Sequence, residues 1–492
     1  MLSDIECRDL AAAFTGHDYT VDAVIALIGE PAQRALGRNS TVAAVGAIGD
    51  RLDPLAVLTL LWPLQRVVAR PAVESALPGL IEPLIGAGIL VDRGGTVAAG
   101  VDIRPYASDD GAAGWIASDL SPNLDTASAP MRSDWVLGVS PASTTLAQLT
   151  VRRPVRRALD LGTGCGVQAL HLARHAASVT ATDLNPRAIE LARLTTSINA
   201  VKVDLRLGSL YQPVAGERFD LITSNPPYVM SPPSRDADRL TYREGDLVGD
   251  GLVEHVVRRG VDHLAESGVL QVLGNWAHRR GQEWQERLAG WVAGTGCDAH
   301  IVQRETLDPY EYIELWLADA GLAGTDGYRD RYTVWLDYFD GLGIEAVGMG
   351  WLVLHRAGRD QPQVRIEDWP YPVEQPIGPA FAAELDAVNL VAGLSDQQIL
   401  QRHWRLADVV EETSGIPGEA DPQHIVLRQH RGFRRARTMD TETAAILGAC
   451  DGELSLEQII ASVALLLGAD LGSVRQRMLA AVDDLVVDGY LR

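Results

Sequence analysis

The residues best suited to chemistry in this chain of 492 residues are Asn225, Pro226 and Tyr228, in the segment Ser-Asn-Pro-Pro-Tyr. The consecutive prolines stiffen the backbone and remove two N–H donors. An amide or exocyclic amine nitrogen is a poor nucleophile, and two acceptors on its hydrogens would draw its lone pair toward an electrophilic carbon. The Asn225 side-chain oxygen and the Pro226 carbonyl can be those acceptors, while Tyr228 can stack on the flat group. The segment predicts transfer to a planar nitrogen by positioning and electrostatics, without a strong base.

A glycine-rich loop over residues 160–166, Asp-Leu-Gly-Thr-Gly-Cys-Gly, provides a candidate cofactor site. Alternate glycines let a backbone turn tightly and approach a ligand. A dinucleotide site prefers a wider glycine spacing, whereas here an acidic residue precedes the first glycine. That favours a ligand with an ammonium group, such as S-adenosyl-L-methionine; a tight turn without a ligand is the alternative. The loop residues assigned to this cofactor are Asp160, Gly162, Thr163, Gly164 and Gly166.

A second strand pattern ends at Asp183, 23 residues after Asp160. A carboxylate at this strand tip can accept the ribose hydroxyls of a nucleoside. The other role open to it is the N-cap of the next helix, but Asn185 stands directly before a proline and suits that role better. The further residues assigned to the cofactor are Asp183, Leu184, Ser209, which follows the third strand where an adenine edge would lie, and Asn225.

The elements that position these residues alternate between strand and helix patterns over residues 133–356, which predicts a parallel sheet. Ligands bind beyond the carboxyl ends of such strands. Two late strands, Ile313–Leu317 and Gly348–His355, are expected to close the sheet antiparallel. The predicted fold class is α/β, with a Rossmann-like seven-stranded domain. The five earlier strands are expected at 158–160, 179–183, 204–207, 219–224 and 269–273.

Two regions flank this domain. Residues 1–106 read as mainly helical, with Asp53 and Pro54 starting one helix. The last helix before 106 is followed by a hairpin pattern, which fits either a winged helix or a small helical cap. Residues 107–132 are rich in Ser, Asp, Gly and Pro and predict a linker. Residues 357–492 begin with a proline-rich stretch and predict a C-terminal domain that is helical or winged-helix-like.

Composition narrows the classes of partner. A net charge of −22 argues against broad nucleic-acid binding. The four cysteines are far apart, so neither a metal site nor a disulfide framework is predicted, and reduced thiols in a cytosol fit best. No apolar stretch is long enough to span a bilayer, and the N-terminus lacks a signal-peptide pattern. We expect a cytoplasmic protein without membrane partners; the sequence does not predict its oligomeric state.

At its glycine loop, Asp183 and Asn225-Pro-Pro-Tyr228, the chain resembles the class I methyltransferases with an Asn-Pro-Pro-Tyr motif. That group includes the release-factor glutamine methyltransferases and the amino methyltransferases of DNA, tRNA and rRNA bases. The resemblance covers 133–356 and implies S-adenosylmethionine binding and transfer to nitrogen. Val139–Thr145 is similar to a segment that folds over the cofactor in the glutamine branch, and Tyr242–Leu252 is similar to its loop ending in Asp-Gly-Leu. The flanking regions have no such counterpart.

The sequence leaves the substrate open. A glutamine-type amide in a protein or peptide is favoured by the acidic charge, and an exocyclic base amine in RNA or DNA is the alternative. The arginine-rich stretch 428–437 could contact phosphates or balance nearby acids. Asp308–Tyr312 could begin a strand that faces the substrate, while Trp276 and His278 could line the pocket or pack. The intact Asn225–Tyr228 segment argues against a cofactor-binding regulator without enzymatic activity.

Overall fold

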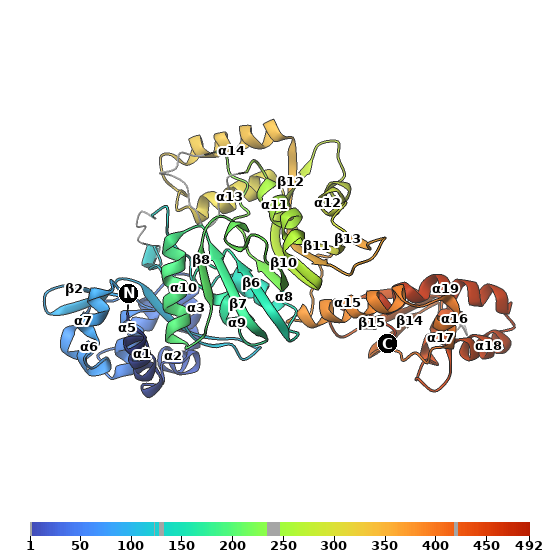
Figure 1. Cartoon of the computed structure of the whole chain (residues 1–492), viewed down its shortest axis with the longest axis horizontal. Coiled ribbons are helices and arrows are strands. Elements are labelled where there is room, and N and C mark those ends of the chain that lie inside the picture. Colours follow the sequence, from blue (N-terminus) through green and yellow to red (C-terminus); the bar gives the residue numbers. More distant parts are fainter. Residues whose placement is uncertain (1, 123, 127–131, 234–246, 418–421) are drawn as a thin grey trace. The chain divides into compact units, whose positions relative to one another are not determined.

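The computed structural model describes residues 2–122, 124–126, 132–233, 247–417 and 422–492. The chain divides into two compact units, one of residues 1–147 with 154–370 and one of residues 148–153 with 371–492 (Figure 1). The expected N-terminal domain of residues 1–106 therefore shares a unit with the sheet. The second unit begins near residue 371, later than the boundary expected at 357. Among the described residues, no helix is long and apolar enough to cross a membrane.

The first unit is built on a central sheet in the order β13-β11-β12-β10-β9-β6-β7-β8. The strands β6 to β10 run parallel, and β12 lies antiparallel between β10 and β11. The order reverses between β6 and β9, which is where open sheets of this kind bind ligands. The expected Rossmann-like fold and its five parallel strands are confirmed. The strands are β6 (Val155–Leu161), β7 (Ala176–Asp183), β8 (Asp204–Leu207), β9 (Phe219–Ser224), β10 (Leu264–Arg279), β11 (Asp298–Leu307), β12 (Ile344–His355) and β13 (Val364–Asp368).

The far end of this sheet corrects the sequence-based prediction. The described strands of the sheet number eight rather than seven. The expected strand Ile313–Leu317 is wrong, because it lies inside helix α13 (Pro309–Asp319). Asp308 is the N-cap of that helix and forms a capping box with Glu311, the signature of a helix start. The sixth strand is β11, whose polar His300 is buried because it pairs with Glu367 of β13 at 2.7 Å.

Helices flank the sheet, and a buried apolar cluster that includes Leu159, Ile222 and Leu270 packs along it. Asn185 is the N-cap of α10, as expected, and accepts from the Arg187 N–H at 2.9 Å. A helical hairpin, α13 with α14, is inserted between β11 and β12. The remaining helices of this region are α8 (Pro141–Leu149), α9 (Val167–Leu172), α10 (Pro186–Ile198), α11 (Gly251–Gly260), α12 (Trp284–Val292) and α14 (Tyr328–Leu342).

The N-terminal part is mainly helical, as expected, and Asp53 caps the helix that begins at Pro54. Over residues 54–99 a helix, a short strand, two helices and a hairpin follow one another, with strand order β1-β3-β2. The winged-helix assignment stays a prediction. The elements are α1 (Asp4–Gly16), α2 (Val21–Ile28), α3 (Glu30–Leu36), α4 (Val42–Ile48), α5 (Pro54–Leu61), β1 (Val68–Ala69), α6 (Arg70–Ala76), α7 (Ile81–Gly86), β2 (Leu90–Asp92) and β3 (Thr96–Ala99).

Residues 107–132 are not simply a linker. The hairpin of β4 (Asp102–Ala107) and β5 (Ala113–Ser118) reaches into this stretch. Its second strand is ordered by distant residues on α10, since the Ala117 N–H donates to Thr195 Oγ1 at 3.0 Å. Hydrogen bonds between residues so far apart in the chain cannot be predicted from the composition of the segment, which is rich in turn-forming residues.

The second unit is described by itself. Its helices and a small antiparallel sheet, in the order β14-β15-β16, surround an apolar core that includes Trp404, Leu447 and Leu485. A winged-helix-like topology for this unit stays a prediction. Its elements are α15 (Gly378–Ala392), α16 (Asp396–Gln401), β14 (Val409–Ser414), β15 (His424–Gln429), β16 (Ala436–Met439), α17 (Thr441–Gly448), α18 (Leu456–Leu467) and α19 (Leu471–Val487).

Candidate functional site

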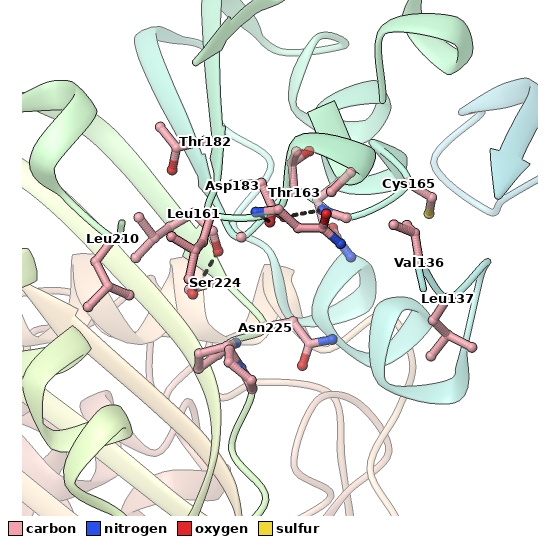
Figure 2. A pocket seen from close by; sticks show the side chains of 18 of the residues that line it. Val136, Leu137, Leu161, Thr163, Cys165, Thr182, Asp183, Leu210, Ser224 and Asn225 are labelled. Atoms are coloured by element: carbon pink, nitrogen blue, oxygen red, sulfur yellow. Dashed lines mark hydrogen bonds between the residues drawn. The ribbon is translucent and has the colours of Figure 1, made fainter. Parts of the chain in front are cut away.

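A cavity of about 380 Å³ lies at the carboxyl ends of strands β6, β7, β8 and β9 (Figure 2). Its size falls within the range of small-molecule sites. In Figure 2, Leu210 lies on one side and Val136 and Leu137 on the other, with Asp183 and Asn225 between them. The cavity is therefore at the point where the strand order reverses.

The glycine loop forms one part of the cavity wall. Gly162 and Gly164 have φ angles of +81° and +54°, which glycine adopts at little cost. A Cβ atom built on either would meet nothing within 4 Å, so these residues leave room for a ligand. Gly166 has another role, because a Cβ there would lie 3.1 Å from the Cα of Ala192. Gly162, Thr163 and Gly164 line the cavity, whereas Gly166 lets α9 pack closely on α10.

Asp160 lies beneath this loop rather than in the cavity wall. Its side chain is only 1% exposed and accepts a hydrogen bond from the Thr163 hydroxyl at 2.6 Å. Burial raises the pKa of the Asp160 carboxyl to about 7; the Thr163 hydrogen bond opposes this rise and the charge of Asp183 adds to it. Asp160 is not among the described residues that line the cavity. Its proposed contact with an ammonium group stays a prediction.

Asp183 does line the cavity. One carboxylate oxygen accepts from the Gly164 N–H and the other from the Asn185 N–H, each at 2.9 Å. These two bonds fix the carboxylate at the tip of β7 while leaving each oxygen a further lone pair. Burial raises its pKa. Leu184 and Ser209, the other residues assigned to the cofactor, also line the cavity.

Asn225 follows the end of β9, and its side-chain oxygen is the site's most informative atom. Ser224 fixes the end of this strand, because its hydroxyl donates to the Leu161 carbonyl at 2.9 Å. Asn225 Oδ1 is buried and has no hydrogen-bond partner within the part of the chain that the structure describes. Buried polar atoms are normally paired, and leaving one unpaired is costly. Since Asn225 and Pro226 line the cavity, a ligand donor is the natural partner.

Tyr228 differs from our expectation. It is not among the described cavity-lining residues. Instead its ring lies edge-to-face with Trp316, with ring centroids 6.3 Å apart, and burial raises its pKa. The chain just beyond is tied to α13, because the Met230 N–H donates to the Tyr312 hydroxyl at 3.1 Å. A stacking contact of Tyr228 with substrate therefore stays a prediction.

Sequence reasoning missed one wall of the cavity, formed by Trp135, Val136, Leu137 and Gly138. No local pattern signals these residues, because they reach the cavity through contacts with distant parts of the chain. The adjoining segment Val139–Thr145 was identified by resemblance, and two of its serines line the cavity. The further lining residues that had not been assigned to the site individually include Ser140, Ser143, Gln168, Leu252 and His255.

Of the Asp-Gly-Leu loop, Tyr242–Leu252, the structure describes residues 247–252, and residues 242–246 lie outside the described residues. Leu247 and Leu252 line the cavity. Asp250 is buried and accepts from the Ala277 N–H at 2.8 Å, and so fixes this loop to β10.

The other candidate residues have structural partners. Trp276 donates to Gln303 Oε1 at 3.0 Å, and His278 Nε2 lies 2.7 Å from the same oxygen, so both pack. Asp308 begins a helix, as described above. In the arginine-rich stretch, Arg428 pairs with Glu412 at 2.8 Å, as expected of residues that balance nearby acids. The further pairs are Arg431 with Glu374 and Arg435 with Asp488.

The cavity holds one cysteine, Cys165, and burial raises the pKa of its thiol to about 11. All four cysteines are buried free thiols. The described residues contain no group of three or more His, Cys, Asp or Glu side chains arranged to hold a metal ion.

Comparisons with known proteins match two parts of the chain. Residues 138–288 match the family model "Methyltransferase small domain", and residues 16–100 match "Domain of unknown function (DUF7059)". The release factor glutamine methyltransferase of Geobacter sulfurreducens is 30% identical over 172 residues, which are 32% of this chain and 58% of that protein. The ribosomal RNA small subunit methyltransferase C of Salmonella arizonae is 30% identical over 121 residues, 24% of this chain and 31% of that protein.

A solved methyltransferase from Pyrococcus furiosus is 18% identical, covers 43% of this chain and 79% of its own, and has a TM-score of 0.26. The chain spans about half the length of the curated relatives it matches. The matched segment contains the glycine loop, Asp183 and Asn225, the residues around the cavity. Residues 138–288 form a methyltransferase domain, and its methyl donor is S-adenosylmethionine.

Proposed function

We propose that this protein is an S-adenosylmethionine-dependent N-methyltransferase that acts on the side-chain amide of a glutamine in a polypeptide. The observation that carries the proposal is the buried, unpartnered Oδ1 of Asn225 in the cavity wall. An acceptor placed there suits a target that brings N–H donors. Glutamine supplies two on one planar nitrogen.

The residues of the cavity fit the cofactor. The open space at Gly162 and Gly164 would accommodate it, Asp183 would accept from its ribose hydroxyls, and Ser209 would contact its adenine. When bound, S-adenosylmethionine supplies an electrophilic methyl group. These assignments rest on cavity position and on hydrogen-bonding capacity.

Asn225 and Pro226 act on the target. The Asn225 side-chain oxygen and the Pro226 carbonyl accept from the two N–H groups of the amide, which orients the nitrogen and draws its lone pair forward. With the methyl donor bound, the nitrogen would bond to the methyl carbon as the bond from that carbon to sulfur breaks, and one N–H proton would leave to water. Preorganised acceptors of this kind account for the rate without a strong base.

The charge near Asn225 favours a polypeptide over a nucleic acid. The inserted hairpin of α13 and α14 contacts the chain just after Asn225–Tyr228, because the Tyr312 hydroxyl accepts from the Met230 N–H. The Tyr338 hydroxyl also accepts from the Gly249 N–H at 2.8 Å. A polyanion approaching this hairpin would be repelled by its excess of acidic residues. The acidic residues of this region are Asp308, Glu311, Glu314, Asp319, Asp326, Asp330, Asp337, Asp340 and Glu345, against Arg329 and Arg331.

The proposal is tested by mass spectrometry of the protein and RNA pools from a strain that lacks this chain. We expect a methylated glutamine to disappear from one polypeptide and to return when the intact chain, but not Asn225→Ala, is supplied. Loss of a methylated base from RNA, with protein glutamines unchanged, would replace the polypeptide by a nucleic acid as substrate.

A further inference from the structure

The segment that follows strand β5 is bonded to the cavity wall that sequence reasoning missed. Asp119 is joined twice to Val136: its N–H donates to the Val136 carbonyl at 3.1 Å, and its Oδ2 accepts from the Val136 N–H at 2.9 Å. Trp135 is held beside them, because its indole N–H donates to the Leu120 carbonyl at 3.1 Å. The wall is therefore fixed to residues that belong to neither the matched methyltransferase segment nor the glycine loop.

The second oxygen of Asp119 is bonded to helix α10. Asp119 Oδ1 accepts from Arg187 Nε at 3.1 Å and from Arg187 Nη2 at 2.9 Å. The Asp119 side chain is 10% exposed and that of Arg187 is 22% exposed, so this pair is far better shielded than a surface ion pair. Arg187 stands in the first turn of α10, whose N-cap is Asn185 and which follows the strand tip at Asp183. One carboxylate thus joins the wall at Val136 to the strand tip that carries Asp183.

A second hydrogen bond also connects the start of α10 to the segment that contains the wall. Asn185 Nδ2 donates to the Asp134 carbonyl at 2.8 Å, so the start of α10 holds the wall from a second side. Along the same helix, Asn199 exchanges hydrogen bonds with the backbone of Trp115 at 3.0 and 2.7 Å. The hairpin strand β5, Asp119 and the wall are thus one continuous attachment of the N-terminal part to α10.

We propose that Asp119 is a positioning residue for the cofactor. It holds the wall of Val136 and Leu137 in place relative to Asp183 and so sets the width of the cavity between them. Figure 2 shows Val136, Leu137 and Asp183 around the cavity. The N-terminal part of the chain thereby forms part of the cofactor site. This inference rests on the proposed function, since it takes S-adenosylmethionine as the ligand of the cavity.

The test is calorimetric binding of S-adenosylmethionine and S-adenosylhomocysteine to the full chain and to three variants. Val136 and Arg187 donate to different oxygens of Asp119, so in Asp119→Asn one of them faces an NH2 group, which cannot accept. Arg187→Gln removes the other partner and leaves the Asp119 bond to Val136 in place. Each is expected to weaken binding about tenfold, the scale of one hydrogen bond to a charged group. Glu190→Gln is the matched control, since this exposed carboxylate pairs with the same arginine at 3.3 Å and is not among the described residues that line the cavity; it should leave binding unchanged.

The double variant Asp119→Asn/Arg187→Gln tests whether the two residues act on cofactor binding through their shared contact. The effects on affinity of two substitutions that break the same contact do not add. The double variant should therefore bind the cofactor about as weakly as whichever single variant binds it more weakly. Wild-type affinity in a folded Asp119→Asn or Arg187→Gln variant, or a double variant weakened by the product of the two single effects, would overturn the inference. If Asp119→Asn does not fold, the comparison of Arg187→Gln with Glu190→Gln decides it. A wild-type chain that binds neither ligand would instead overturn the proposed function on which it rests.

Discussion

The carboxylate of Asp183 accepts a hydrogen bond from the backbone N–H of Gly164 at 2.9 Å. This one bond joins the tip of β7 to the glycine loop that follows β6. The glycine loop and Asp183, the two features on which the predicted cofactor site rests, are therefore joined directly, and a change at Asp183 also acts on the loop.

The first prediction concerns Asp183→Ala. We expect the affinity for S-adenosylmethionine to fall by about 1.5–3 kcal/mol, because a charged acceptor for the ribose hydroxyls is lost. Calorimetry on the purified protein measures the change. Asp204→Ala is the matched control, since Asp204 lies on the neighbouring strand β8, pairs with Arg206 and is half exposed. Equal affinities in the two variants would remove Asp183 from the cofactor site.

The second prediction concerns Asn225→Ala. Turnover should fall by about 10²–10³, the typical effect of losing one preorganised contact, while cofactor affinity largely survives. The reason is that, in the proposed function, the buried Oδ1 accepts from the target nitrogen rather than from the cofactor. Transfer of a labelled methyl group under saturating cofactor gives the rate, and calorimetry gives the affinity. Near-normal turnover by this variant would rule out the assigned role.

The third prediction concerns the buried carboxyl of Asp160, whose pKa burial raises from an ordinary value of 3.8 to about 7. Between these two pH values the folded chain keeps a proton that the unfolded chain has lost. Its contribution to stability is therefore fully present below about pH 4 and is lost as the pH rises toward 7. The loss amounts to about 1.4 kcal/mol for each pKa unit of the shift.

Urea unfolding at several pH values between 4 and 8 measures this effect. The free energy of unfolding of the wild type should fall, relative to that of Asp160→Asn, as the pH rises. The asparagine keeps an acceptor for the Thr163 hydroxyl and does not titrate. Two curves that stay parallel over the whole range would show that Asp160 keeps an ordinary pKa in the folded chain.

The parts of the site that sequence reasoning identified depend on local patterns. The turn at Gly162 and Gly164 needs glycine for its positive φ angles, and Asp183 and Asn225 each stand directly at a strand end. The five parallel strands were predicted for the same reason, since each is a short local pattern of apolar residues, broken only by Gln271 at 269–273 but alternating with polar ones at 204–207.

The parts that were missed depend on contacts between distant residues. Strand β11 lacks the apolar pattern of a buried strand because it carries His300 and Gln303. Their hydrogen-bond partners, which allow them to be buried, lie on other strands and cannot be recognised from the local sequence. The wall at Val136 is positioned by Asp119, 17 residues earlier in the chain. The strand expected at Ile313–Leu317 is instead a helix, and the residues just before it signal this. Asp308 followed by Pro309 is an acidic N-cap followed by proline, which marks a helix start.

The fourth prediction concerns the class of substrate and the arginine-rich stretch 428–437. Arg435 is only 7% exposed, lies 4.7 Å from the ring centroid of Phe433 and pairs with Asp488, so reversing its charge would disturb the fold. Arg434 is exposed, which makes Arg434→Glu the informative variant. Contacts with phosphates would make binding fall steeply with salt, in proportion to the number of phosphates neutralised.

We expect the opposite, because the charges in this stretch are largely balanced by acids and because the hairpin near Asn225 is acidic. Binding of total cellular RNA to the purified chain, measured between low and physiological salt, should be weak throughout and unchanged by Arg434→Glu. Methyl transfer to a polypeptide substrate should likewise depend little on salt. Tight RNA binding that weakens steeply as salt rises and is reduced by Arg434→Glu would favour a base amine as the target. Total cellular RNA is a suitable probe for this, because contacts with phosphates do not depend on the base sequence.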